Sequence, residues 1–84
     1  MNIQLIPIDE LAEAVLSKLK EIITLPEESD ITTTLYGMGV DSVQLAELEM
    51  ILEIEYKLPT TNLHSSMTCR DISLELKRLD DDRS

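Results

Sequence analysis

The sequence predicts an all-α fold, a small four-helix bundle made of three main helices and one short helix. Apolar residues recur at helical spacing in three segments, and no segment alternates in the period of two that is typical of a strand. The chain has no Phe or Trp and two Tyr among 84 residues, so aliphatic side chains must form the core. A chain of this length forms one domain, residues 1–84, with a modest core.

The first helix is predicted from Pro7-Ile8-Asp9 to about residue 23. Asp9 is the expected N-cap, and Ile8 is available as a hydrophobic staple. Charged residues occupy one side of this helix and apolar residues the other, which is typical of a helix that packs on a core. The apolar side comprises Leu11, Val15, Leu19 and Ile22.

A long loop is predicted from residue 24 to residue 41, because this segment contains Pro26, a polar run and two glycines. Ile31, Leu35 and Met38 are the expected apolar anchors. Loops of this length are usually functional. The acidic run at residues 27–30 lacks the regular oxygen spacing and the central glycine of a calcium-binding loop, so we expect no metal.

The second main helix is predicted from Gln44 to Tyr56, with Asp41 as its cap and Ser42 on its first turn. One apolar face is assigned to the core: Leu45, Leu48, Leu52 and Tyr56. A second apolar face points almost the opposite way: Val43, Ala46, Met50 and Ile54. Glu47 and Glu53 flank this second face, so its composition suits weak, reversible docking of a partner. Alternatively, part of it packs on the long loop or the third helix.

A short helix or turn is predicted around Leu63, and the last helix is predicted to begin at Met67-Thr68. Thr68 is the expected cap, with Asp71 at the capping-box position. Residues 80–84 are predicted to form a flexible tail. Cys69 shares an apolar stripe with three aliphatic residues, which indicates a buried structural thiol, and a single cysteine favours a reducing compartment.

The composition is strongly acidic, with 17 Asp and Glu against 7 Lys and Arg and a formal charge of −10. This charge argues against binding to nucleic acid or to an anionic membrane, and favours a partner with a basic face. An alternative is that the acids only keep a small protein soluble. Neither a signal peptide nor a membrane span is predicted, so a cytoplasmic location is expected.

Nothing in the chain predicts an active site. No nucleophile stands beside a base, and there is no metal-ligand cluster and no tuned carboxylate pair. His64, the one histidine, lies in a polar turn, where a surface role is expected. The sequence therefore predicts a non-catalytic protein.

The segment Gly39-Val40-Asp41-Ser42-Val43 is the most informative part of the chain. It places a serine at a loop-to-helix junction, where free N–H groups and the positive end of the helix dipole favour an attached phosphate. Further matches follow in order along nearly the whole chain: Leu35, Met38, Tyr56, Leu58, Pro59, Thr68, Asp71 and Ile72. Together these residues resemble the acyl and peptidyl carrier proteins, which have small helical folds.

The resemblance implies that Ser42 carries 4′-phosphopantetheine, covalently attached from coenzyme A by a phosphopantetheinyl transferase. The terminal thiol of this group would hold acyl, aminoacyl or polyketide intermediates as thioesters for a loading enzyme, a ketosynthase or condensation enzyme, and a thioesterase or acyltransferase. The protein itself would be a monomeric tether. The initial Met1 and the short tails predict a free-standing carrier, and the alternative is a domain excised from a larger protein. The expected partner-binding residues are Asp41, Val43, Gln44, Ala46, Glu47, Met50, Glu53 and Ile54.

The sequence says less about the biosynthetic pathway than about the role as a carrier. The segments Asp41-Ser42-Val43-Gln44-Leu45 and Leu58-Pro59-Thr60-Thr61-Asn62-Leu63 resemble carriers of polyketide or non-ribosomal peptide assembly. Glu49 stands at a usually apolar position beside the inward face, where it would narrow or polarise any space for a buried acyl chain. Fatty acid synthesis and D-alanyl or other aminoacyl transfer remain alternatives. From another class, the alternative is an acidic helical adaptor that only docks a partner.

Overall fold

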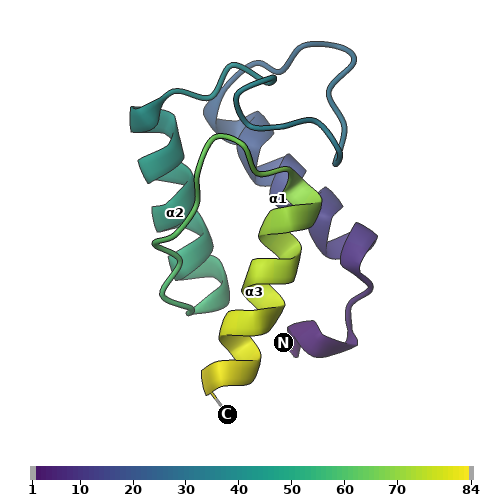
Figure 1. The fold of residues 1–84 in the computed structure, drawn as a ribbon, viewed down its shortest axis with the longest axis vertical. Coiled ribbons are helices and arrows are strands. Elements are labelled where there is room, and N and C mark those ends of the chain that lie inside the picture. Colours follow the sequence, from purple (N-terminus) through teal and green to yellow (C-terminus); the bar gives the residue numbers. More distant parts are fainter. Residues whose placement is uncertain (1, 84) are drawn as a thin grey trace.

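The computed structural model describes residues 2–83, which form three long helices and one short 3-10 turn (Figure 1). In chain order these are η1 (Ile3–Leu5), α1 (Ile8–Ile22), α2 (Ser42–Tyr56) and α3 (Cys69–Arg83). Helix α1 packs against both of the other long helices, and its larger contact is with α3. Within residues 2–83 no strand forms, and the all-α prediction is confirmed; Thr34 and Thr68 make an isolated antiparallel bridge.

Helix α1 begins at Ile8, close to the predicted start, but its predicted cap is wrong. The N-cap is Pro7, which forms no side-chain capping bond, and Asp9 lies inside the first turn. Proline pre-sets the backbone angle that a helix start needs and lacks an N–H to satisfy there. Asp9 instead pairs with Arg70, with 3.0 Å between its Oδ1 and the arginine Nε, and so links α1 to α3.

The short fourth helix predicted around Leu63 is not formed. Residues 57–67 carry no helix, and the turn in this segment is at Ser65 and Ser66. Leu58, Thr60 and Leu63 are buried anchors, and their spacing along an irregular chain fits no single helical face. The one short helical element among residues 2–83 is η1, which lies before α1 near the N-terminus. The sequence did not predict it.

The predicted cap of α3 is confirmed. The Thr68 N–H donates to Asp71 Oδ2 over 3.0 Å, and the Asp71 N–H donates to Thr68 Oγ1 over 3.1 Å. Residues 80–83, predicted as part of a flexible tail, form the last turn of α3, where Arg83 Nη1 donates to the Lys57 carbonyl over 2.8 Å. Whether that turn opens in solution stays a prediction, and Ser84 lies outside the described residues.

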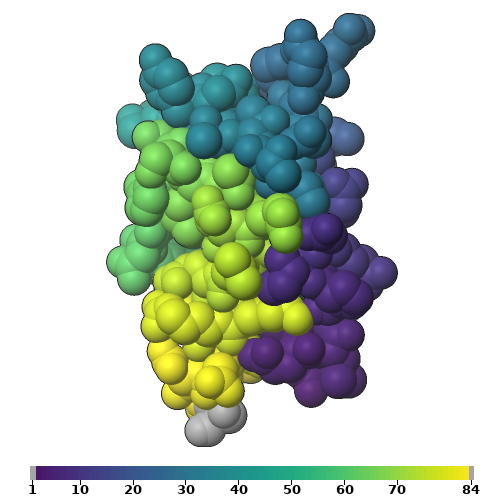
Figure 2. All heavy atoms as spheres, turned by 45° about the vertical axis from the view of Figure 1, so that its right-hand side comes forward, coloured from purple at the N-terminus to yellow at the C-terminus, as the bar shows by residue number. Residues whose placement is uncertain are grey.

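The N-terminal segment lies against the far end of α3, as Figure 2 shows at the base of the molecule. Gln4 Nε2 donates to the Lys77 carbonyl over 2.8 Å and to Asp80 Oδ2 over 3.1 Å, and Lys77 Nζ donates to the Ile6 carbonyl. These bonds fasten η1 to α3. No helix in residues 2–83 combines the length and the apolar character needed to cross a bilayer.

The core is aliphatic, as predicted, and its largest fully buried members come from all three helices and from the two loops that join them: Leu11, Leu19, Leu35, Met38, Leu48, Leu52, Leu58, Ile72 and Leu76. The Cys69 thiol lies among them with no exposed surface, which confirms the predicted structural role. Burial, together with the charge of Glu13, raises the pKa of Cys69 to about 12. Because the thiolate is the reactive form, Cys69 is inert in the folded protein.

Candidate functional site

Ser42 is the first residue of α2, and its side chain is exposed. Asp41 precedes it as the N-cap: its Oδ1 accepts a hydrogen bond from the Gln44 N–H over 2.8 Å. Gln44 Oε1 in turn accepts from the Asp41 N–H over 3.0 Å, which completes a capping box. The predicted cap is confirmed, and the box holds Ser42 at the helix end with its hydroxyl open to solvent.

The chain reaches this cap through a tight turn at Gly39, whose φ is +85°. Other L residues rarely adopt that angle, and no atom lies within 4 Å of a Cβ placed there, so the need for glycine is conformational. The Val40 N–H then donates to the Leu35 carbonyl over 3.0 Å, and the Val40 side chain is buried. This anchor fixes where Asp41 and Ser42 emerge.

The start of α2 is electrically suited to an anion. The N–H groups of the first turn have no partners within the helix, and the helix dipole places partial positive charge there. A phosphate ester on the Ser42 hydroxyl would lie against this positive end. The local residues therefore fit a phosphorylated group at Ser42.

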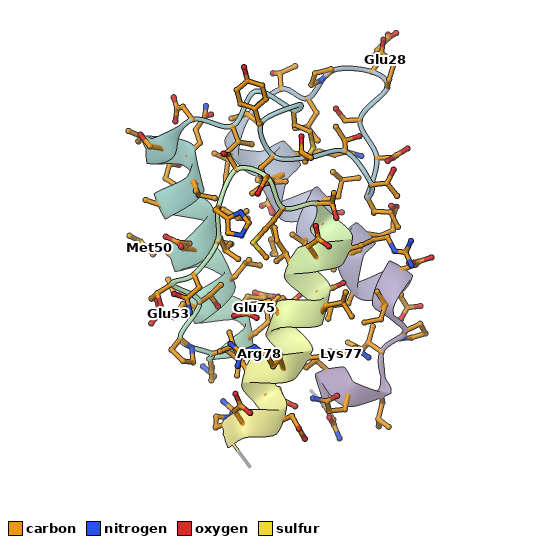
Figure 3. The ribbon with its side chains drawn as sticks, viewed as in Figure 1. Glu28, Met50, Glu53, Glu75, Lys77 and Arg78 are labelled. Atoms are coloured by element: carbon orange, nitrogen blue, oxygen red, sulfur yellow. The ribbon has the colours of Figure 1, made fainter. Side chains whose placement is uncertain are left out.

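The second apolar face of α2 is exposed, which confirms its predicted geometry and contradicts the alternative that it packs on the loop or α3. Val43 is 67% exposed, Met50 62% and Ile54 70%. Figure 3 shows Met50 and Glu53 on the side of α2 that points away from the bundle. We call this surface the outer face of α2 and define it by Val43, Ala46, Glu47, Met50, Glu53 and Ile54, all exposed.

The charge on α2 has one sign. The helix contains four glutamates and no basic residue. Arg70 and Arg78 lie on α3, where Arg78 pairs with Glu75 and Asp82 at 2.8 and 2.7 Å, and Figure 3 shows Glu75 and Arg78 together on that helix. On α2, Glu55 pairs with Lys18 at 3.8 Å, whereas Glu47 and Glu53 form no ion pair within residues 2–83. The outer face thus combines aliphatic side chains with negative charge.

Two predicted contact residues, Asp41 and Gln44, are engaged in the cap, and Gln44 is half-buried. They lie at the edge of the outer face, and their side chains hold the helix end. Their role in partner contact stays a prediction.

A groove of about 600 Å³ opens beside Ser42. One wall comes from the α1–α2 loop and the other from the α2–α3 loop, and the lining residues are Tyr36, Gly39, Val40, Asp41, Ser42, Leu45, Leu63, His64 and Ser65. The Tyr36 N–H donates to the Ser65 carbonyl over 2.9 Å and joins the two walls. We call this the serine groove. Sequence reasoning missed it, because its walls come from separate loops; the paired aliphatic anchors of those loops were the available signal.

His64 lies on the surface, as predicted, and its Nδ1 is 2.7 Å from Ser66 Oγ. Among residues 2–83 no group of three or more His, Cys, Asp or Glu side chains could hold a metal ion. The Asp41 carboxylate, the acid next to Ser42, is occupied by the capping bond. Within residues 2–83, no hydrogen bond joins the Ser42 hydroxyl to a basic side chain, although His64 lines the same groove.

Glu49 lies on the inward side of α2 and is half-buried. Its Oε2 accepts a hydrogen bond from the Leu63 N–H over 3.3 Å. The expectation that this carboxylate polarises the space beside the inward face agrees with its position.

Comparison with known proteins gives one family match. The family described as "Phosphopantetheine attachment site" matches residues 13–76, which include α2 and both of its flanking loops. Proteins of this family carry covalently attached 4′-phosphopantetheine and are non-catalytic carrier domains.

One curated relative is similar across most of the chain. It is Nonribosomal peptide synthetase atrA of Aspergillus terreus, with 31% identity over 78 residues that cover 87% of this chain. The matched region is 8% of the relative's own length, so this chain spans a small part of that protein. No solved structure matches the chain.

Proposed function

Because the chain belongs to the phosphopantetheine attachment family, we propose that Ser42 is the residue that carries its 4′-phosphopantetheine. The observation that carries this proposal is the exposed Ser42 hydroxyl on the first turn of α2, behind the Asp41 cap and beside an open groove. We call the attached group the arm. When bound, the arm supplies a terminal thiol that can hold an acyl or aminoacyl group as a thioester.

Ser42 acts as a substrate in the attachment reaction. Its Oγ forms the new bond to the phosphorus of coenzyme A that bears the pantetheine, the pyrophosphate bond breaks, and adenosine bisphosphate leaves. The serine proton must pass to a base on the transferase, because Asp41 is held in the cap. The positive end of α2 then stabilises the phosphodiester.

Partner enzymes would dock on the outer face of α2, with Asp41 and Gln44 at its edge. The acidic groups would draw the carrier toward a basic patch and speed encounter, and the exposed aliphatic groups would add contact area on docking. Because such contacts are weak, the carrier can leave after each step while its tether keeps the intermediate at high effective concentration. The proposed role is that of a non-catalytic, monomeric carrier in the cytoplasm.

The pathway we favour is of the non-ribosomal peptide type, and the similarity to a non-ribosomal peptide synthetase supports this choice. Polyketide, fatty acyl and D-alanyl carriers would share the same serine and differ in what the thiol holds. We also propose that the protein works as a carrier when it is a separate chain. The test is to add the purified protein to loading and condensation enzymes and to measure whether they load it and use its thioester.

Intact-mass measurement after incubation with coenzyme A, magnesium and a broad-specificity transferase tests the attachment. The wild type should gain one phosphopantetheine, and Ser42→Ala should gain none. Ser65→Ala is the matched control, since Ser65 is an exposed serine on the same groove, and it should be modified like the wild type. An arm on Ser42→Ala, or none on the wild type, would refute the proposal.

A helical adaptor that only docks partners would use the outer face without the serine. For that protein, Ser42→Ala would leave function in cells intact. The carrier role requires complete loss of function in Ser42→Ala, with unchanged helical content by circular dichroism.

A further inference from the structure

The serine groove runs along one side of α2 and meets a charged residue. One row of side chains follows this side of the helix at spacings of three and four residues. It contains Ser42, Leu45, Glu49 and Leu52. Ser42 and Leu45 line the groove, Glu49 does not, and Leu52 is fully buried in the core. Glu49 therefore stands between the open groove and the interior of the bundle.

Glu49 also holds the opposite wall in place. The hydrogen bond from the Leu63 N–H to Glu49 Oε2 joins α2 to the α2–α3 loop at a residue that is only 7% exposed. Further along, the same loop is tied to the α1–α2 loop, because the Tyr36 N–H donates to the Ser65 carbonyl and the Leu35 N–H to the Met67 carbonyl. The wall of the groove is thus fixed on both sides of His64.

An apolar chain that moved past Leu45 and Leu63 would have to separate this pair. It would remove water from the Glu49 carboxylate and leave the Leu63 N–H without an acceptor, and both changes are unfavourable in a partly buried place. A short or polar group meets no such obstacle, because it can remain in the groove between Tyr36 and His64.

We propose that Glu49 sets the depth of the serine groove, so that the carrier keeps short or polar acyl groups, aminoacyl groups among them, at its surface and excludes long acyl chains from the bundle. This inference rests on the proposed function, because a carried group reaches the groove only from Ser42. Glu49 acts here as a positioning residue through its bond to Leu63.

The test compares acetyl and octanoyl groups on the intact protein. Each group is installed on Ser42 with a broad-specificity transferase and the matching acyl coenzyme A, and loading is verified by intact mass. Methyl NMR then reports on Leu45 and Leu63, which line the groove, and on Leu48 and Leu52, which are fully buried. Cleavage of the thioester by hydroxylamine measures how far the carried group is shielded.

In the wild type, octanoyl should shift only the groove methyls, and its cleavage rate should lie within about twofold of that of acetyl. In Glu49→Leu, octanoyl should also shift Leu48 and Leu52 and be cleaved at least about fivefold more slowly than acetyl. Glu55→Leu is the matched control: it makes the same change on the same helix, at an exposed residue outside the groove, and should behave like the wild type.

Two results would overturn the proposal. The first is that octanoyl on the wild type is already cleaved fivefold more slowly than acetyl and shifts the methyl signals of Leu48 and Leu52. This result can be obtained from the wild type alone. The other is a folded, fully loaded Glu49→Leu protein without any dependence on chain length. Failure of loading at the mass-spectrometry step would instead contradict the assignment of Ser42, so the two failures are distinguishable.

Discussion

The backbone N–H of Leu35 donates to the carbonyl of Met67 over 2.8 Å, so the loop before α2 and the loop before α3 are held side by side. Leu35 is fully buried at this junction. The next residue repeats the connection with Ser65, and together the two bonds form the link between the walls of the serine groove. The shape of the site therefore depends on contacts between loops as well as on the helix that presents Ser42.

The cap of α2 should contribute measurable stability. Asp41→Ala removes the acceptor of the Gln44 N–H and should lower the free energy of unfolding by about 1 kcal/mol. Urea denaturation followed by circular dichroism measures the difference. Asp41→Asn, whose side chain can accept the same bond, should lie within a few tenths of a kcal/mol of the wild type. Equal losses in both variants would show that the capping bond is not the cause.

The buried thiol predicts a dependence of stability on alkaline pH. Well below pH 9, the ordinary pKa of this thiol, Cys69 is protonated in both the folded and the unfolded state and adds no pH dependence. Above it, the unfolded chain loses the proton while the folded chain, with a pKa of about 12, keeps it. Stability should therefore fall between pH 9 and pH 12, with a slope of at most about 1.4 kcal/mol per pH unit from this group.

Denaturation curves at several pH values check this slope, with Cys69→Ala as the control. Cys69→Ala should be less stable than the wild type at neutral pH, because the smaller side chain leaves a cavity. Its free energy of unfolding should nevertheless fall less steeply with pH, because the thiol is absent. The same decline in both proteins would assign it to other groups that titrate in this range.

Reversal of one charge on the outer face of α2 should affect encounter more than stability. Glu47→Lys should slow productive association with the transferase and with the cognate enzyme, and should weaken the dependence of the rate on salt. Glu47 is exposed, so the melting temperature should barely change. Stopped-flow rates across a salt series provide the measurement, and an unchanged rate at every salt concentration would remove Glu47 from the docking surface.

Truncation of an apolar side chain on the same face should act on the bound complex. Met50→Ala should weaken binding by about 1 kcal/mol or more, mainly through faster dissociation, if Met50 is a contact anchor. Met50 is 62% exposed, so folding stability should change little. Leu74→Ala is a matched control, since Leu74 is an exposed aliphatic residue on α3, and it should bind as the wild type does. Wild-type affinity in Met50→Ala would contradict this anchor.

The features that the sequence predicted correctly depend on residues close together in the chain. The caps at Asp41 and Thr68 join residues three apart, so the pattern of polar side chains was sufficient to place them. The outer face was also predictable, because a helix with two opposite apolar faces cannot bury both in a bundle of this size.

The features that it missed depend on distant contacts. The segment around Leu63 has no helix, and three of its backbone groups, at Leu63, Ser65 and Met67, bond to Glu49, Tyr36 and Leu35 on other parts of the chain. Local propensity carries no information about these partners. The serine groove was missed for the same reason, and the cap of α1 was misplaced because Asp9 pairs with Arg70 on another helix.

The hydrogen bonds between η1 and the end of α3 determine from which side the protein can be attached to a support. Figure 1 shows that η1 and the last turn of α3 lie at the base of the bundle, whereas the start of α2 lies at the top. A linker, a bead or a sensor surface joined to either end would approach the molecule from the side opposite Ser42. Immobilised protein should thus leave its serine accessible to an enzyme in solution, whichever end is anchored.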